Sequence, residues 1–259
     1  MPRFPVPGAD LAVEISDEGG PPVVQLHGLT SSRSRDRVLD LDLGRGLTGT
    51  RLLRYDARGH GDSSGREMAE DYRWSSLADD LLRLVDHWFP GEQVHGVGPS
   101  MGAATLLHAA VRAPDRFSGL TLLVPPTAWE TRPAKAEEYR EAAVLVESRG
   151  VDGFIAAGRD RPRPPATADA PDTSPDVPER LLPAVLRGAA LSDLPRHDDI
   201  ARLDIPTTVL AWVDDPSHPV STARILVELL PRATVEVVST PGEVLRWPDR
   251  LRDDVARLT

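Results

Sequence analysis

Ser100 lies at the centre of the stretch Gly98-Pro99-Ser100-Met101-Gly102. An apolar segment that predicts a strand precedes this stretch, and an apolar segment that predicts a buried helix follows it. A serine on so sharp a turn projects beyond the end of a sheet, and the flanking glycines let strand and helix approach closely. The stretch therefore predicts a nucleophilic serine. The alternative is a structural turn with an idle serine.

A serine hydroxyl needs a base within hydrogen-bonding distance to attack a carbonyl group at neutral pH. Of the seven histidines, His218 stands out because it follows a late predicted strand in the phrase Asp214-Asp215-Pro216-Ser217-His218. Either aspartate is near enough in sequence to hold the imidazole ring. His197, at the end of the region between two predicted strands, could also reach the site from above.

Two backbone N–H groups could stabilise the oxyanion that such an attack produces. His27-Gly28 ends the first predicted strand, and Gly28 permits a turn that aims the Leu29 N–H into the site. The Met101 N–H, at the start of the buried helix, would be the second donor. Thr30, which follows Leu29, is a candidate for the substrate pocket.

The strand and helix pattern predicts the scaffold that would bring these loops together. Short apolar runs predict strands over 21–28, 50–56, 92–98, 118–126, 206–213 and 233–239. Most are apolar at nearly every position, which is typical of parallel strands covered on both faces. Helical patterns over 75–88, 101–113, 221–230 and 248–258 alternate with them. We therefore expect an α/β fold with a mostly parallel sheet between two layers of helices.

Residues 127–205 break this alternation because they contain no convincing strand. They predict a helix over 135–150 that ends at Gly150, a long loop over 161–178 and a second helix over 178–191. We therefore divide the chain into a core, 1–126 and 206–259, and a cap insertion, 127–205. Trp129 opens that insertion near the expected mouth of the site and is a second pocket candidate.

The composition limits the possible functions. Thirty basic against forty acidic residues give a net charge of −10, which disfavours nucleic acids and anionic membranes as partners. The absence of cysteine excludes disulfides and thiolate chemistry. No metal-ligand spacing or phosphate-binding glycine motif is present, so we expect no metal and no cofactor. The sequence shows neither a signal peptide nor a membrane-length apolar run, which predicts a cytoplasmic protein. The oligomeric state stays open.

Four stretches in this order resemble the α/β-hydrolase superfamily, and within it bacterial enol-lactonase-like and carboxylesterase-like hydrolases. They are HG (27–28), RYDARGHGDSSG (54–65), GPSMG (98–102) and APDRFSGLTLLVPPTAW (113–129). The resemblance implies a triad in the chain order serine, acid, histidine. Ser100 matches the nucleophile and Asp215 the acid, with Asp214 the next best match. Glu243 stands where the family's histidine is expected, so the usual base is replaced.

Three assignments of the base follow: His218 as a relocated base, Glu243 or His197 as the base, or no base at all. A relocated base predicts a serine hydrolase that forms an acyl-enzyme with a small ester, thioester or lactone, and it places His218 about 3–4 Å from Ser100. A missing base predicts a small-molecule binder or a non-covalent cyclase or lyase, with His218 facing solvent or backbone. A protein-interaction module would instead expose a large apolar patch and lack an enclosed pocket.

Overall fold

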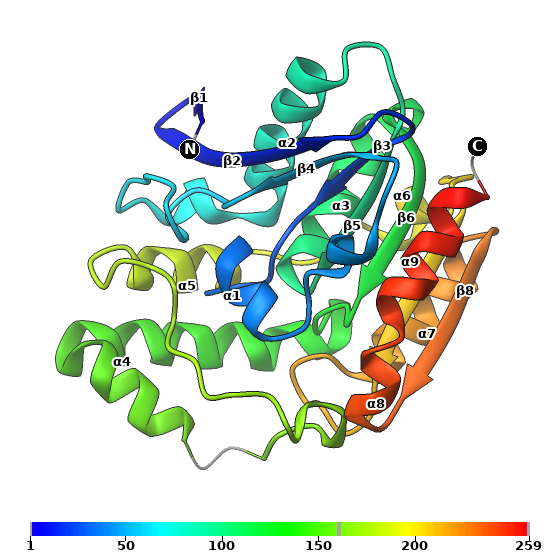
Figure 1. The fold of residues 1–259 in the computed structure, drawn as a ribbon. Helices are drawn as coiled ribbons and strands as arrows, with labels where there is room; N and C mark the ends of the chain where they lie inside the picture. The colour runs from blue at the N-terminus through cyan, green and yellow to red at the C-terminus, as the bar shows by residue number, and fades with distance from the viewer. Residues whose placement is uncertain (1, 160–161, 258–259) are drawn as a thin grey trace.

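The computed structural model describes residues 2–159 and 162–257, and these contain a sheet of eight strands in the order β1-β2-β4-β3-β5-β6-β7-β8 (Figure 1). The strands are β1 (Arg3–Val6), β2 (Ala9–Asp17), β3 (Pro22–Gln25), β4 (Arg51–Tyr55), β5 (Val94–Pro99), β6 (Phe117–Leu123), β7 (Thr207–Trp212) and β8 (Ala233–Val238). β2 is antiparallel to β1 and β4, and all other neighbouring strands are parallel. The expected α/β class is therefore confirmed.

Helices cover both faces of this sheet. They are α1 (Arg33–Val38), α2 (Trp74–Trp88), α3 (Met101–Arg112), α4 (Arg132–Gly158), α5 (Leu182–Ala190), α6 (His197–Ile200), α7 (Val220–Leu229), α8 (Pro241–Val244) and α9 (Trp247–Ala256), with 3₁₀ helices η1 (Leu43–Gly46), η2 (Ala69–Tyr72), η3 (Pro114–Arg116), η4 (Trp129–Thr131) and η5 (Pro165–Thr167). α2, α3 and α7 pack on one face, and η1, α8 and α9 pack on the other. In the described part of the chain, no helix is both long and apolar enough to cross a membrane.

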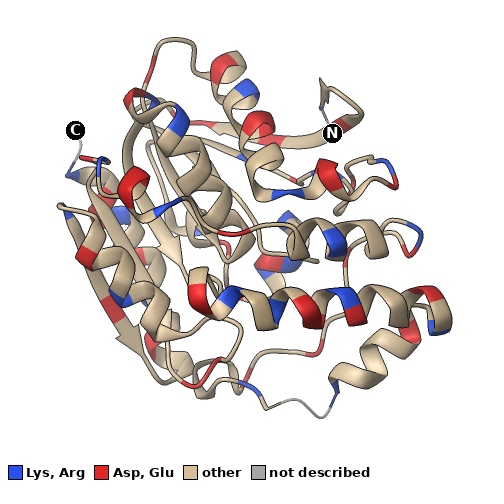
Figure 2. Cartoon of the chain, turned by 180° about the vertical axis from the view of Figure 1, so that it is seen from behind, with Lys and Arg blue, Asp and Glu red and all other residues tan. Residues whose placement is uncertain are grey.

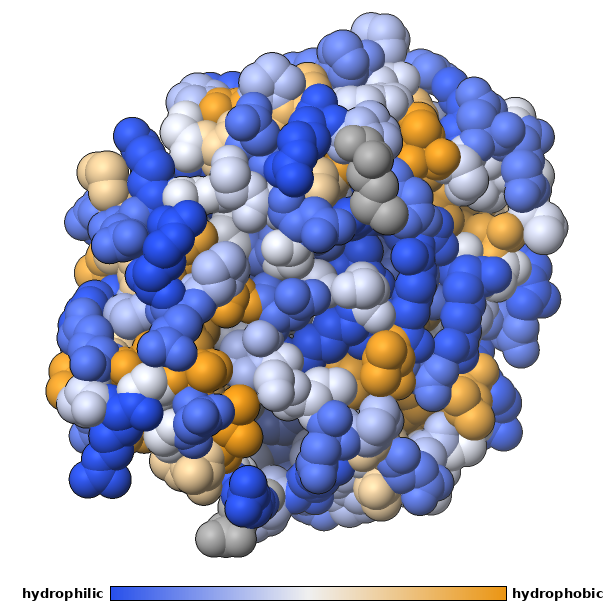
Figure 3. Space-filling model, turned by 60° about the vertical axis from the view of Figure 1, so that its left-hand side comes forward, coloured by the Kyte–Doolittle hydropathy of each residue, from blue (hydrophilic) through white to orange (hydrophobic). Residues whose placement is uncertain are grey.

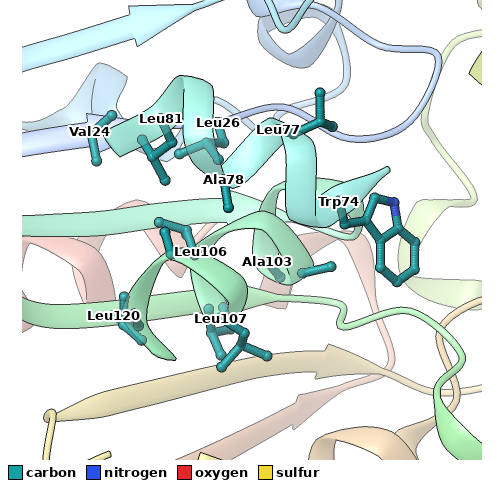
Figure 4. Packing of buried hydrophobic residues seen from close by; sticks show 14 of the residues in the cluster. Val24, Leu26, Trp74, Leu77, Ala78, Leu81, Ala103, Leu106, Leu107 and Leu120 are labelled. Atoms are coloured by element: carbon teal, nitrogen blue, oxygen red, sulfur yellow. The ribbon is translucent and has the colours of Figure 1, made fainter. Parts of the chain in front are cut away.

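Successive residues of the central strands enter different hydrophobic clusters, because side chains alternate between the two faces of a strand. Val24 and Leu122 join the cluster under α2 and α3, whereas Val23 and Leu123 join the cluster under α9. Figure 4 shows the first cluster, in which α2 and α3 lay their apolar side chains between each other and the sheet. Burial on both faces explains why these strands are apolar at nearly every position.

The N-terminal strands β1 and β2 were outside the strands that the sequence pattern predicts. The second half of β2, from Glu14 onward, is polar and largely exposed, so it lacks the continuous apolar run of the central strands. Pairing with β4 holds it in the sheet instead.

The segment between β6 and β7 lies beyond the carboxyl ends of the parallel strands, where α4 and α5 pack against each other (Figure 1). The first helical segment of α4 ends at Gly150, as predicted, because the backbone there has φ +68° and ψ −177°, outside the helical region. The sequence pattern did not predict the second helical segment, which follows this kink and continues to Gly158. Acidic and basic residues both occur along the length of α4 (Figure 2). That this segment acts as a cap stays a prediction.

The long loop expected over 161–178 contains η5 as its one helix in the part that the structure describes, and residue 161 lies outside the described residues. Its later half crosses α1. The Asp176 carboxylate accepts a hydrogen bond from Ser32 Oγ at 2.5 Å, and the Asp176 N–H donates to Thr30 O at 2.9 Å. Gly61 N–H in turn donates to Asp176 O at 2.8 Å. The loop is therefore attached to the turn that follows β3.

Candidate active site

Ser100 occupies a strained turn between β5 and α3. Its backbone has φ 51° and ψ −108°, a region that residues with a side chain seldom adopt. The Ser100 N–H donates to Leu123 O at the end of β6 at 2.9 Å, which holds the turn against the sheet. The turn therefore presents the Ser100 hydroxyl beyond the carboxyl end of β5, as the sequence predicts.

Gly98 and Gly102 allow this turn because Leu26 of the neighbouring chain segment lies against both. A Cβ atom built on either glycine would lie 2.9 Å from Leu26 Cβ, closer than such atoms approach in proteins. A Cβ on Gly102 would also lie 3.0 Å from His27 O. Both positions therefore require glycine, because Leu26 and the His27 carbonyl group leave no room for a side chain there.

His218 lies within hydrogen-bonding distance of Ser100. Its Nε2 atom is 2.9 Å from Ser100 Oγ, and its Nδ1 atom is 2.7 Å from Asp215 Oδ2. A proton on Nδ1 would be donated to the carboxylate and would leave Nε2 free to accept the Ser100 proton. Ser100, His218 and Asp215 therefore form one hydrogen-bonded series, although they come from two loops 115 or more residues apart.

Asp215 is held by donors on three sides. Besides the imidazole, Trp212 Nε1–H donates to Oδ2 at 2.7 Å and the Ser217 N–H donates to Oδ1 at 2.9 Å. Burial by itself would raise the pKa of Asp215, but the hydrogen bonds and charge of His218, with those other donors, hold it well below its ordinary value. The carboxylate is therefore charged across the whole pH range in which an imidazole titrates.

The loop after β7 reaches Ser100 because β6 alone separates β7 from β5 in the sheet. The loop turns at Asp214, with φ 58°, and the Thr127 N–H, which follows β6, donates to Ser217 O at 3.0 Å. Trp212, at the end of β7, stacks on Trp247 with the ring planes 15° apart. The polar and apolar contacts together fix the segment that carries His218.

The two predicted oxyanion donors are the Leu29 N–H, in the turn after β3, and the Met101 N–H, at the start of α3. In the described residues, neither the Leu29 N–H nor the Met101 N–H donates to a protein acceptor, so both stay available to a ligand. Gly28 lies against Ser100, since a Cβ on it would be 3.9 Å from Ser100 Cβ. Thr30 follows with φ 58° and lines the cavity, as predicted.

Two buried histidines support this turn without entering the cavity. His27 Nε2 accepts the Ala57 N–H at 2.9 Å, so Nδ1 carries the proton and donates to Gly28 O at 2.8 Å. Burial lowers the pKa of His27, and it lowers that of the adjacent His60 to about 3. Both rings are therefore neutral and structural, which leaves His218 beside the serine.

Three sequence candidates lie elsewhere. The Glu243 carboxylate caps α8, where it accepts hydrogen bonds from Ser239 N at 2.9 Å and Thr240 N at 3.0 Å. His197 packs edge-on against Trp129 at 4.3 Å between ring centres, and Trp129 Nε1 donates to a backbone carbonyl. None of the three is among the described residues that line the cavity, contrary to expectation. Helix capping explains Glu243, because a glutamate at the third helical position suits this role.

A cavity of about 950 Å³ opens in front of Ser100 and His218 and extends under α4 to the loop after it. Apolar side chains form much of its wall, including Leu29, Val124, Leu145, Phe154, Leu186 and Trp212. On the face shown in Figure 3, hydrophobic residues lie in small groups among hydrophilic ones. A cavity of this size, with both apolar and polar side chains in its wall, suits a small organic ligand. Among the described residues, no group of acidic or histidine side chains could hold a metal ion.

Asp36 is a buried carboxyl at the edge of this cavity. It is 1% exposed, its Oδ1 accepts a hydrogen bond from Ser31 Oγ at 2.5 Å, and its Oδ2 has no partner among the described residues. Burial raises the pKa of Asp36 from 3.8 to about 7. The charge of Asp42 raises it further, and the bond from Ser31 opposes both. The folded protein thus holds a proton on Asp36 that the unfolded chain releases near pH 4.

This shift predicts a loss of stability as the pH rises. Between about pH 4 and pH 7 the folded state binds more protons than the unfolded state, so the free energy of unfolding falls with rising pH and then levels off. Relative to Asp36→Asn, the wild type should lose about 2–4 kcal/mol between pH 4.5 and pH 8. Urea denaturation across this range measures the difference. The exposed Asp115→Asn serves as control, and a difference independent of pH would contradict the prediction.

The sequence and the fold of this chain are similar to those of known proteins. Residues 21–166 match the profile of a family described as alpha/beta hydrolase fold. The 3-oxoadipate enol-lactonase 2 of Acinetobacter baylyi is 28% identical over 196 residues, which cover 72% of this chain and 70% of that protein.

Two solved structures share the fold over nearly the whole chain. The enol-lactonase from Burkholderia xenovorans superimposes with a TM-score of 0.77 at 21% identity and covers 99% of both chains. The thermophilic esterase from Thermogutta terrifontis superimposes with a TM-score of 0.76 at 21% identity, over 99% of this chain and 97% of that one. At this level of identity the structural likeness concerns the fold.

Proposed function

The chain belongs to the α/β-hydrolase fold family and is a hydrolase-like enzyme, and from that premise we propose that it is a serine hydrolase acting on a small carboxylic ester, thioester or lactone. The observation that carries the proposal is the hydrogen-bonded series from Ser100 Oγ to His218 Nε2, 2.9 Å, and from His218 Nδ1 to Asp215 Oδ2, 2.7 Å. The names of the enol-lactonase and the esterase that resemble this chain agree with that substrate class.

In the first half of the proposed reaction, Ser100 Oγ attacks the carbonyl carbon while its proton passes to His218 Nε2. The carbonyl oxygen becomes an oxyanion, to which the Leu29 and Met101 N–H groups donate hydrogen bonds. Asp215 stabilises the imidazolium and keeps its ring in place. His218 then gives the proton to the leaving oxygen or sulfur as that bond breaks, which leaves an acyl group on Ser100.

In the second half, a water molecule replaces the leaving group. His218 Nε2 accepts one of its protons while the oxygen attacks the acyl carbon, and the same oxyanion donors act again. Collapse of this intermediate returns the proton to Ser100 Oγ and releases the carboxylic acid. For a lactone, the leaving hydroxyl stays part of the same product molecule.

The base in this mechanism lies on the loop after β7 instead of the loop after β8. The position is workable because a triad depends on the geometry of its groups and not on their order in the chain. Asp215 and His218 belong to one short segment, so the acid–base pair forms independently of the last loop. Glu243 then serves only to cap α8. The alternative of a binder or a non-covalent cyclase or lyase predicts that His218 faces solvent or backbone, whereas its Nε2 lies 2.9 Å from Ser100 Oγ, which supports the hydrolase proposal.

The proposal is tested by a fluorophosphonate probe, which reacts covalently only with an activated serine. We expect the wild type to gain one probe mass in intact-protein mass spectrometry and Ser100→Ala to gain none. Ser174→Ala is the matched control, because Ser174 also lines the cavity and should not affect labelling. A wild type that is neither labelled nor active on a panel of phenyl esters and lactones would exclude a serine hydrolase.

A further inference from the structure

The positively charged side chains of the cavity wall differ in how their charge is balanced. Lys135 Nζ lies 2.8 Å from Glu138 Oε2, and Arg163 forms an ion pair with Asp172. Arg35 is bound by neutral oxygens instead: its Nε donates to Thr173 Oγ1 at 2.8 Å and its Nη1 to Thr30 O at 2.6 Å. In the described residues no carboxylate lies within ion-pair distance of it.

The two acids nearest to Arg35 in the sequence and the fold are engaged elsewhere. The Asp176 carboxylate accepts the hydroxyl protons of Ser32 and Ser34. Asp36 is buried, and its raised pKa of about 7 leaves it largely protonated below neutral pH. Glu138 and Glu141 face the cavity from α4, across from α1. Burial lowers the pKa of Arg35, which reflects the cost of holding a cation in this wall without a direct counter-ion.

The position of Arg35 relates it directly to the reacting groups. The carbonyl group that its Nη1 contacts belongs to Thr30, one residue after the oxyanion donor Leu29. The neighbouring Gly28 lies against Ser100. An anion bound by Arg35 would therefore lie on the same wall as the oxyanion site, beside the apolar lining of the cavity.

We propose that Arg35 binds a carboxylate of the substrate, so that the esters or lactones attacked by Ser100 carry an acidic group. A guanidinium has five N–H donors in a planar fork, and two of those of Arg35 are used by Thr173 and Thr30. The remaining donors on Nη1 and Nη2 form the pair of parallel hydrogen bonds that suits a carboxylate. The hydrogen bonds to Thr173 Oγ1 and Thr30 O hold the Arg35 guanidinium in place before a ligand binds, and because both acceptors are neutral the positive charge is not balanced. This inference rests on the proposed function.

The test compares two esters that differ only in charge: the mono-4-nitrophenyl ester of glutaric acid and its methyl-capped diester. We expect wild-type kcat/KM to be at least about 10-fold higher for the acidic ester, and Arg35→Gln to reduce this ratio by about 10-fold or more. Arg35→Lys, which keeps the charge but loses the fork, should give an intermediate ratio. Arg163→Gln is the matched control, and its ratio should stay within about two-fold of the wild type.

Two results would overturn the inference. One is a wild type with no preference for the acidic ester. The other is an Arg35→Gln variant that loses activity equally on both esters, which would mean that Arg35 only supports the Thr30 turn.

Ser100→Ala protein separates this inference from the proposed function, because binding of the two intact esters can be measured by calorimetry without turnover. Tighter binding of the acidic ester that Arg35→Gln abolishes supports the inference even if the wild type proves inactive. Equal binding of both esters overturns it, whatever the outcome of the fluorophosphonate experiment.

Discussion

Replacing His218 with alanine should lower kcat/KM for a good ester substrate by about 10⁴-fold or more. Without the imidazole, Ser100 Oγ would lose the acceptor that lies 2.9 Å away and would have to attack as a neutral hydroxyl. KM should change little, since the ring mainly removes and returns a proton. Steady-state kinetics with a 4-nitrophenyl ester, calibrated by the fraction of folded protein from circular dichroism, give the comparison.

The matched controls are His197→Ala and Glu243→Gln. Both residues were candidates for the base, and both lie outside the described lining of the cavity. Each variant should keep kcat/KM within about three-fold of the wild type. A large loss in either variant with full activity in His218→Ala would refute the relocated base and identify the alternative one. Added imidazole should partly restore His218→Ala if the vacated space admits it.

Asp215→Asn should lower kcat by about 10²–10⁴-fold while the fold is retained. The asparagine amide offers an N–H where the carboxylate accepts one, so it favours the imidazole tautomer with the proton on Nε2, which cannot accept the Ser100 proton. It also removes the negative charge that stabilises the imidazolium. The same substitution weakens the acceptor for Trp212 Nε1, which lies 2.7 Å from the carboxylate. The rate should be measured from pH 5 to pH 9.

Asp214→Asn is an internal control for this experiment, since the two aspartates are adjacent but only Asp215 contacts the ring. Asp214 is exposed, and its role is to turn the backbone, which asparagine performs equally well at φ 58°. We expect activity within about two-fold of the wild type. Equal losses in both variants would show that the loop tolerates no change of charge and would remove the assignment of Asp215 as the orienting acid.

The sequence predicts the sheet well because its five central strands, β3 to β7, are buried on both faces, which leaves runs of apolar residues that are visible without a structure. It predicts Ser100 for a similar reason, since the small residues around it are forced by contact with Leu26. The N-terminal strands were not predicted, because half of β2 is exposed and lacks a continuous apolar run. The glycine correctly marks the end of the first helix at Gly150, but nothing local in the sequence predicts that a second helical segment follows the kink.

The candidate site is only partly predictable for a different reason. The sequence indicates that His218 and the two aspartates share a loop, and the family resemblance favours Asp215 over Asp214, but the residue types and spacing alone leave both aspartates as partners of the ring. The contacts of Ser32 and Arg35 with Asp176 and Thr173 join residues more than 130 positions apart. No local sequence pattern predicts such contacts, because each partner taken alone is an ordinary polar residue in a loop. Trp129 was misplaced for the same reason, since its partner His197 lies far along the chain.

The orienting acid and the proposed base are the first and last residues of the segment Asp215-Pro216-Ser217-His218. Within this segment the Ser217 N–H donates a hydrogen bond to the Asp215 carboxylate. One continuous segment of the chain therefore carries both ionisable groups that act with Ser100. Contacts outside the segment set its position relative to the sheet, since Trp212 donates to Asp215 and the Thr127 N–H donates to Ser217 O. A shift of this loop relative to Ser100 would therefore change the distance between the proposed base and the serine while the distance between the acid and the base stays the same.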